Sequence, residues 1–186
     1  MDMDNMMNEM GGAFMVAWLA GGMDDLGGAL VLAAAWMAIS GAHILPVITW
    51  GHIMTGDLGD TDAWTDNGSR LVAQMVGAIL ALMLVGEGSH DAAAAPDMWS
   101  FDLWATLTAV GAGALLWTVY DRCDAWVTAF VVMAMAGTLS LGGAADMGGA
   151  LIGGGDDMAA SALAWIMDGL WVGVGALVAT KVPDML

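Results

Sequence analysis

Long apolar runs separated by short aspartate-rich stretches dominate this chain of 186 residues. The hydrocarbon core of a bilayer is about 30 Å thick and needs about 20 helical residues for each crossing. At 59% hydrophobic and 12% charged, the chain is too apolar to surround one water-facing core with a polar shell. We therefore expect an all-α membrane protein with six spans, at about 6 to 23, 26 to 40, 70 to 86, 100 to 119, 124 to 141 and 159 to 182.

The charge of the chain is strongly negative, because 20 acidic residues stand against 3 basic ones and give a net charge of −17. Nucleic acids and anionic lipid headgroups are poor partners for such a chain, since both are negatively charged. Nearly all the acids are aspartates, which suits a halophilic protein whose surface repulsion is screened by concentrated salt. A skewed or designed composition explains the same bias. The single cysteine, Cys123, excludes a disulfide-stabilised scaffold.

The three basic residues give an orientation, because lysine and arginine collect on the cytoplasmic side of membrane proteins. Arg70 and Arg122 fall at the connections after the second and fourth expected spans and Lys181 at the C-terminus, which would all lie on one side of the membrane. We therefore expect a multi-pass protein of the cell membrane with its N- and C-termini in the cytoplasm.

Two apolar stretches, 46 to 54 and 147 to 155, are too short to cross and occupy corresponding places in the two halves of the chain. Such pairs indicate re-entrant half-helices, although surface loops with apolar content explain them as well. Three spans and one half-helix in each half predict an inverted repeat of about 6 to 88 and 100 to 182. The repeats would form a single domain, residues 1–186.

Several segments resemble one known family. Residues 39 to 49 read ISGAHILPVIT, close to I-S-G-A-H-x-N-P-A-V-T, and residues 72 to 79 read VAQMVGAI, close to V-A-Q-x-x-G-A-I. Glu9, Gly12 and Phe14 match E-x-x-G-T-F, while residues 142 to 150, GGAADMGGA, are loosely similar to G-G-A-M-N-P-A-R-A. From about residue 9 to 182 the chain thus resembles the aquaporins and glycerol facilitators of the major intrinsic protein family.

The resemblance implies a site for each part of a pore. The junction of the half-helices would contain Leu45, Pro46, Val47, Asp146, Met147 and Gly148. The selectivity region would contain Gly149, Ala134 and His43, and the half-helices would be supported by Glu9 and Asp102. Asp102 could instead cap its own helix, and His43 could serve local packing.

The chain departs from the family at the pore itself. Leu45 and Asp146 stand where the family has two asparagines, and Gly149 stands where it has an arginine. Leu45 offers no hydrogen-bond donor, and an ionised aspartate can only accept. These losses favour a neutral solute larger than water over strict selectivity for water.

The expected function is passive conduction of water or a small neutral solute such as glycerol, by a homotetramer in the lipid bilayer. We expect no enzyme and no cofactor, because the sequence pairs no nucleophile with a base. We expect no metal site either, with His52 and His90 on the solvent side. Two alternatives remain: a non-conducting structural membrane protein plugged by Leu45, Val47 and Met147, and a designed water-soluble analogue of the fold. Asp168, inside the sixth span, could face the pore, another subunit or the end of a deeper-set span.

Overall fold

The structure is a computed structural model that describes residues 2–20, 23, 25–85, 102–136, 139, 141, 143–153 and 158–182. These residues form eight helices, and the segments described contain no strand, which confirms the all-α prediction. The helices are α1 (Met3–Leu19), α2 (Leu26–Ala38), α3 (Pro46–Thr55), α4 (Thr61–Val85), α5 (Leu103–Arg122), α6 (Ala125–Ala136), α7 (Ala144–Gly153) and α8 (Met158–Lys181).

Among the described residues, three helices are long and apolar enough to cross a membrane: Thr61–Val85, Leu103–Arg122 and Ser161–Lys181 within α8. The helices α2 and α6 are apolar but shorter, with 13 and 12 residues. At about 1.5 Å per residue they extend about 20 and 18 Å, less than the thickness of a bilayer core. The three long helices are compatible with a helical membrane protein. The helix α6 ends before the predicted limit at residue 141.

The outward faces of the helices are apolar. Large side chains that are mostly exposed include Met37 on α2 at 74%, Met83 on α4 at 66% and Trp104 on α5 at 77%. Many acidic side chains lie instead at helix ends, as Asp25 and Asp102 do at the N-caps of α2 and α5. This distribution suits a belt of lipid around the helices and water at their ends.

The helix α4 begins nine residues earlier than the predicted start at residue 70. Asp60 starts it, because its carboxylate accepts hydrogen bonds from the backbone N–H groups of Asp62 and Ala63 at 2.9 and 3.3 Å. These first turns are polar, so hydropathy alone does not reveal them. Arg70 consequently lies inside a helix and not in a connection.

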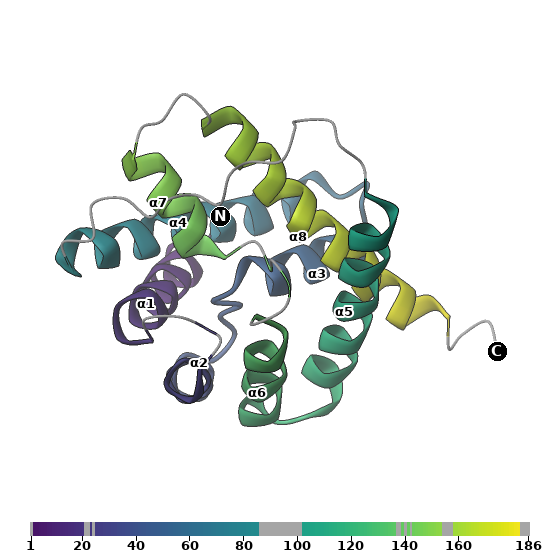
Figure 1. Ribbon diagram of the computed structural model, residues 1–186, viewed down its shortest axis with the longest axis horizontal. Coiled ribbons are helices and arrows are strands. Elements are labelled where there is room, and N and C mark those ends of the chain that lie inside the picture. The colour runs from purple at the N-terminus through teal and green to yellow at the C-terminus, as the bar shows by residue number, and fades with distance from the viewer. Residues whose placement is uncertain are drawn as a thin grey trace.

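The helices pack in pairs that repeat between the two halves of the chain (Figure 1). The helix α1 packs against α4, and its counterpart in the second half, α5, packs against α8. The short helices cross between the halves: α3 packs against α8, and α7 packs against α4. The helices α2 and α6, one from each half, pack against each other. Exchanging the first four helices for the last four turns the α1–α4 pair into α5–α8 and the α3–α8 pair into α7–α4, and leaves the α2–α6 pair unchanged, so the packing pattern repeats between the halves.

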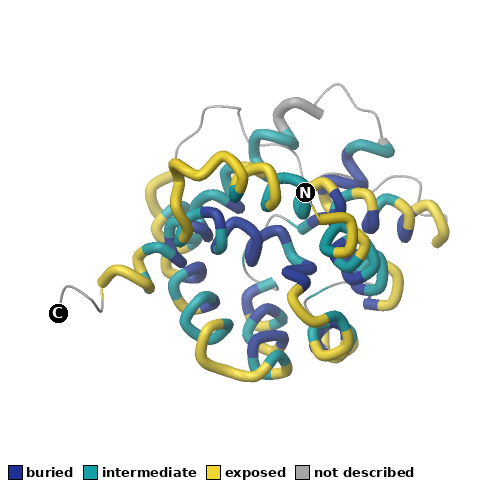
Figure 2. Tube along the Cα trace, turned by 180° about the vertical axis from the view of Figure 1, so that it is seen from behind, coloured by how far each residue is buried: buried dark blue, intermediate teal, exposed yellow. Residues whose placement is uncertain are grey.

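The short helix α3 lies in the middle of this assembly, where burial is greatest (Figures 1 and 2). Seven of its ten residues are buried: Pro46, Val47, Ile48, Thr49, Trp50, Gly51 and Ile53. The longer helices around it bury one face and expose the other (Figure 2). The segment that leads into α3 is therefore the natural place to look for a site.

Glycines allow the paired helices to approach closely. A Cβ at Gly77 of α4 would collide with the carbonyl oxygen of Met10 in α1. In the other half, a Cβ at Gly113 of α5 would collide with the carbonyl oxygen of Val172 in α8. Close backbone packing through small residues is typical of helices in membranes.

Candidate functional site

The segment between α2 and α3 turns sharply before the half-length helix begins. Leu45 is the N-cap of α3 and makes no side-chain cap hydrogen bond, while Pro46 occupies the first turn. Gly41 and Ile44 both have positive φ, at 81° and 65°. This conformation costs a β-branched residue such as Ile44 about 1–2 kcal/mol, so the surrounding contacts must hold it in place.

Glu9 of α1 holds this turn in place. Its carboxylate accepts hydrogen bonds from the backbone N–H groups of His43 at 2.6 Å and Ile44 at 2.7 Å. Glu9 is fully buried, at 0% exposure. A buried carboxylate that accepts hydrogen bonds from two consecutive backbone amides fixes both the position and the direction of the chain.

Two side chains of α4 complete the surroundings of Glu9. The guanidinium of Arg70 forms an ion pair with it at 2.6 Å, and the amide of Gln74 donates to it at 2.7 Å. Arg70 also donates to the carbonyl oxygen of Gly41 at 3.0 Å. Four donors therefore satisfy the buried charge of Glu9, which is the condition for tolerating such a charge inside a protein.

The imidazole of His43 continues the polar cluster. Its Nδ1 lies 3.1 Å from Oγ1 of Thr49, which also accepts a hydrogen bond from Gln74 at 3.0 Å. Burial lowers the pKa of His43 below its ordinary value, and the nearby His52 and Arg70 act in the same direction. His43 is therefore neutral at physiological pH.

His52 was expected on the solvent side, but the structure places it half-buried beside His43. Its ring stacks on His43 with centroids 4.1 Å apart and planes 4° apart. The rings of Trp117 and Tyr120 of α5 pack against it nearly at right angles, with centroids at 5.0 and 5.9 Å. No group of three or more candidate metal ligands occurs among the residues described, and a stacked pair does not point its nitrogens at a common ion.

A cavity of about 370 Å³ lies on one side of the turn, where both short helices begin. Asp146 is the one charged side chain among the described residues that line it. The others have apolar side chains or none: Ala13, Val16, Ala17, Ala20, Met23, Ile44, Leu45, Pro46, Val47, Ala78, Leu82, Val132, Ala136, Leu139, Leu141, Gly143, Ala144 and Ala145. We call this space the apolar cavity.

A second cavity of about 350 Å³ lies between α2, α5 and α6. It has polar side chains at Tyr120, Asp121, Cys123 and Thr128, and we call it the polar cavity. The rest of its lining is formed by Trp36, Ile39, Gly41, Ala42 and Ala125.

The two cavities approach each other from opposite ends of α6. Thr128 lines the polar cavity and Val132 the apolar one. Four residues along a helix correspond to about 6 Å, or roughly one turn. The segment before α3 divides in the same way, because Ala42 lines the polar cavity and Ile44 the apolar one.

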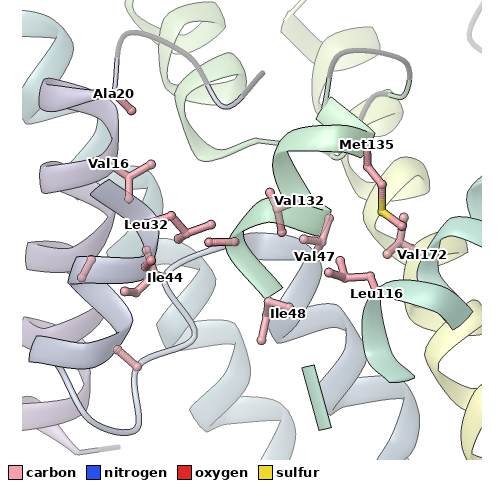
Figure 3. Packing of buried hydrophobic residues seen from close by; sticks show 14 of the residues in the cluster. Val16, Ala20, Leu32, Ile44, Val47, Ile48, Leu116, Val132, Met135 and Val172 are labelled. Carbon is pink, nitrogen blue, oxygen red and sulfur yellow. The ribbon is translucent and has the colours of Figure 1, made fainter. Parts of the chain in front are cut away.

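Buried apolar side chains adjoin the residues that line the two cavities. Leu32, Ile48 and Ala129 are at 0% exposure and line neither cavity. They belong to one cluster with Val47 and Val132, whose members come together from different helices (Figure 3). Ala129 follows Thr128 of the polar cavity and Ile48 follows Val47 of the apolar one, so this apolar layer adjoins both cavities.

The predicted junction residues gather near the apolar cavity. The cavity is lined by Leu45, Pro46, Val47 and Asp146. The other two predicted residues, Met147 and Gly148, are buried in α7, and Gly148 packs against Ile79 of α4. Of the predicted selectivity residues, Gly149 is buried, whereas Ala134 is exposed on α6. Val132 and Ala136 line the cavity from that helix in place of Ala134.

Asp102, the predicted counterpart of Glu9 in the second half, does not occupy an equivalent buried position. It is exposed, and its carboxylate accepts hydrogen bonds from the N–H groups of Trp104 and Ala105 at 2.8 and 3.2 Å. It therefore caps α5, the alternative that its place at a helix start allowed. Asp168 lies half-buried on α8.

Three members of the polar cluster were not predicted from the sequence: Arg70, Gln74 and Thr49. Arg70 and Gln74 are four residues apart, so they share one face of a helix. The sequence did contain a signal for this contact: Glu9 was expected to be buried in the first span, and two donors four residues apart occur at the start of the third. Comparison with known proteins found no matching protein family and no matching curated sequence.

Proposed function

We propose that the chain is a multi-pass membrane channel of the aquaporin class, a passive path for water or small uncharged solutes. The helices α1, α2, α4, α5, α6 and α8 would be its six spans, and α3 and α7 its half-helices. The repeated packing of the two halves supports an inverted repeat, because each half contributes three spans and therefore enters from the opposite side.

One observation carries the proposal: two cavities whose linings lie about one helical turn apart along α6, with the segment before α3 lining both and an apolar layer adjoining both. A solute that crossed this layer would pass from Thr128 to Val132 along α6. An ion would lose its hydration shell there and find no polar side chain in Leu32 or Ile48 to replace it. The desolvation free energy of a small neutral molecule is much smaller, so the geometry favours neutral solutes.

Shrinkage of proteoliposomes under a sucrose or a glycerol gradient tests conduction directly. The wild-type protein should accelerate shrinkage or re-swelling over empty liposomes. Val132→Ala shortens a side chain of the layer and should raise the rate further, whereas Leu30→Ala on α2, whose side chain is 57% exposed, should leave it unchanged. Equal rates for empty liposomes, the wild type and Val132→Ala under both gradients would reject the channel.

A non-conducting structural membrane protein is the second candidate, and the filled centre supports it. The layer differs, however, from the plug of Leu45, Val47 and Met147 expected from the sequence, because Leu32, Ile48 and Ala129 contribute to it. In the same proteoliposomes this candidate predicts no conduction by the wild type or by Val132→Ala.

The proposal places both termini in the cytoplasm, because Arg122 and Lys181 stand at the ends of α5 and α8 and would face the same side. The outward apolar faces support insertion in lipid over a water-soluble analogue. Retention in the membrane after an alkaline wash tests this. A homotetramer follows from the family resemblance, and native mass spectrometry of the detergent complex tests it.

A further inference from the structure

We propose that the apolar cavity is a binding site for one compact, uncharged, apolar molecule of about the size of benzene. The inference concerns binding in equilibrium and holds whether or not the protein conducts. It rests on the volume of the cavity and on the chemistry of the residues that line it.

The volume is sufficient for such a ligand. An apolar cavity of about 150 Å³ in a protein interior stays dry and accepts benzene or xenon. At about 370 Å³, this cavity is larger. Its walls lack the contacts that a filled core would make, and a ligand with a rigid apolar body restores them.

The lining disfavours the equilibrium binding of water-like and polyol ligands. A buried water needs two to four polar partners, and glycerol must satisfy three hydroxyl groups. Among the described residues that line the cavity, no side chain carries a hydroxyl or an amide, and Asp146 has the one charged group. Ala13, Val16, Leu82 and Val132 present only methyl and methylene groups. An aromatic hydrocarbon brings no donor or acceptor of its own that would stay unpaired at these walls.

Methionine methyl groups provide the measurement, because they are placed both in the cavity and on the outer surface. Met23 lines the apolar cavity, whereas Met37 and Met83 are 74% and 66% exposed on outward faces. Protein labelled with ¹³C at the methionine methyls is placed in bicelles and titrated with benzene. The Met23 resonance should shift and saturate, while Met37 and Met83 report partition into the lipid and shift in proportion to the total benzene added.

Two matched substitutions separate the site from its surroundings. Ala17→Leu adds a branched side chain at a half-buried position in the cavity wall, and Ala34→Leu makes the same change at an exposed position of α2. Ala17→Leu should abolish the saturable shift of Met23, and Ala34→Leu should preserve it. Glycerol at the same concentrations should produce no saturable shift.

A Met23 response that stays linear like that of Met37, or a saturable response that survives in Ala17→Leu, overturns the proposal. A saturable response to glycerol equal to that for benzene overturns the assigned ligand class. Failure of conduction in proteoliposomes leaves this binding result unaffected, so the two proposals fail separately.

Discussion

Replacement of Glu9 by glutamine would test whether the buried carboxylate holds the turn before α3. The side chain keeps its shape but loses its charge, and an NH₂ group replaces one carboxylate oxygen. Each oxygen of Glu9 accepts two hydrogen bonds: one serves His43 and Arg70, and the other serves Ile44 and Gln74. Whichever way the amide turns, two donors face a donor and lose their partner.

The size of the effect follows from the burial of the pair. Removing one partner of a buried ion pair costs about 3–5 kcal/mol, because the other charge is left uncompensated. The side chain of Arg70 is 15% exposed, so water reaches part of it. We therefore expect Glu9→Gln to lower the free energy of unfolding by about 3 kcal/mol, at the lower end of that range.

Unfolding of the purified protein in mixed micelles by increasing SDS, followed by far-ultraviolet circular dichroism, measures this difference. Asp102→Asn is the matched control, because asparagine caps a helix about as well as aspartate, and it should change the stability by only a few tenths of a kcal/mol, or about zero. Hydrogen exchange adds a local measure: the amides of His43 and Ile44 should lose protection in Glu9→Gln. A loss of stability no greater than that of Asp102→Asn, with both amides still protected, would refute the role assigned to Glu9.

Three further predictions concern packing, access and pH. Gly113→Ala should destabilise the protein by about 1–3 kcal/mol in the same unfolding assay, because the new Cβ meets the carbonyl of Val172, whereas Gly111→Ala, with open space around it, should be neutral or stabilising. A bulky maleimide on the exposed Cys123 should slow solute flux through the polar cavity in proteoliposomes, and Cys123→Ser should be insensitive to the reagent. The lowered pKa of His43 means that the unfolded state takes up its proton first, so stability should fall as the pH drops from 7 to 5, by up to about 1.4 kcal/mol per unit below the unfolded pKa. His43→Gln should reduce this slope in unfolding curves measured at each pH, and the slope that is left should come partly from His52, whose pKa is also lowered by burial.

The sequence predicted where the helices lie better than where they end. Apolar runs located a helix at each expected place, and Pro46 marked the start of α3 because proline fits the first turn of a helix. The start of α4 at Thr61 was missed, since its first turns are polar and are fixed by the Asp60 cap. The end of α6 at Ala136 was missed because hydropathy continues beyond it.

Residues of the site were predictable where one local position decided their role. Leu45 lacks a capping group wherever it sits, and Asp102 at a helix start caps that helix. The ion pair of Glu9 with Arg70 joins residues 61 positions apart, so it depends on how α1 packs against α4. The apolar layer likewise depends on side chains from several helices meeting at one level, which no single segment encodes.

The shortness of α2 and α6 has a consequence for the lipid around the protein. These two helices pack against each other, so their modest length is concentrated in one sector of the circumference. A bilayer that meets this sector must become thinner there, tilt its lipids or leave polar groups in contact with acyl chains, each at a modest cost per Å of mismatch. Such a molecule would deform its surroundings on one side only, and two copies that placed these sectors together would share the deformation. Membrane thickness would then influence both where the protein accumulates and which faces its copies turn toward each other.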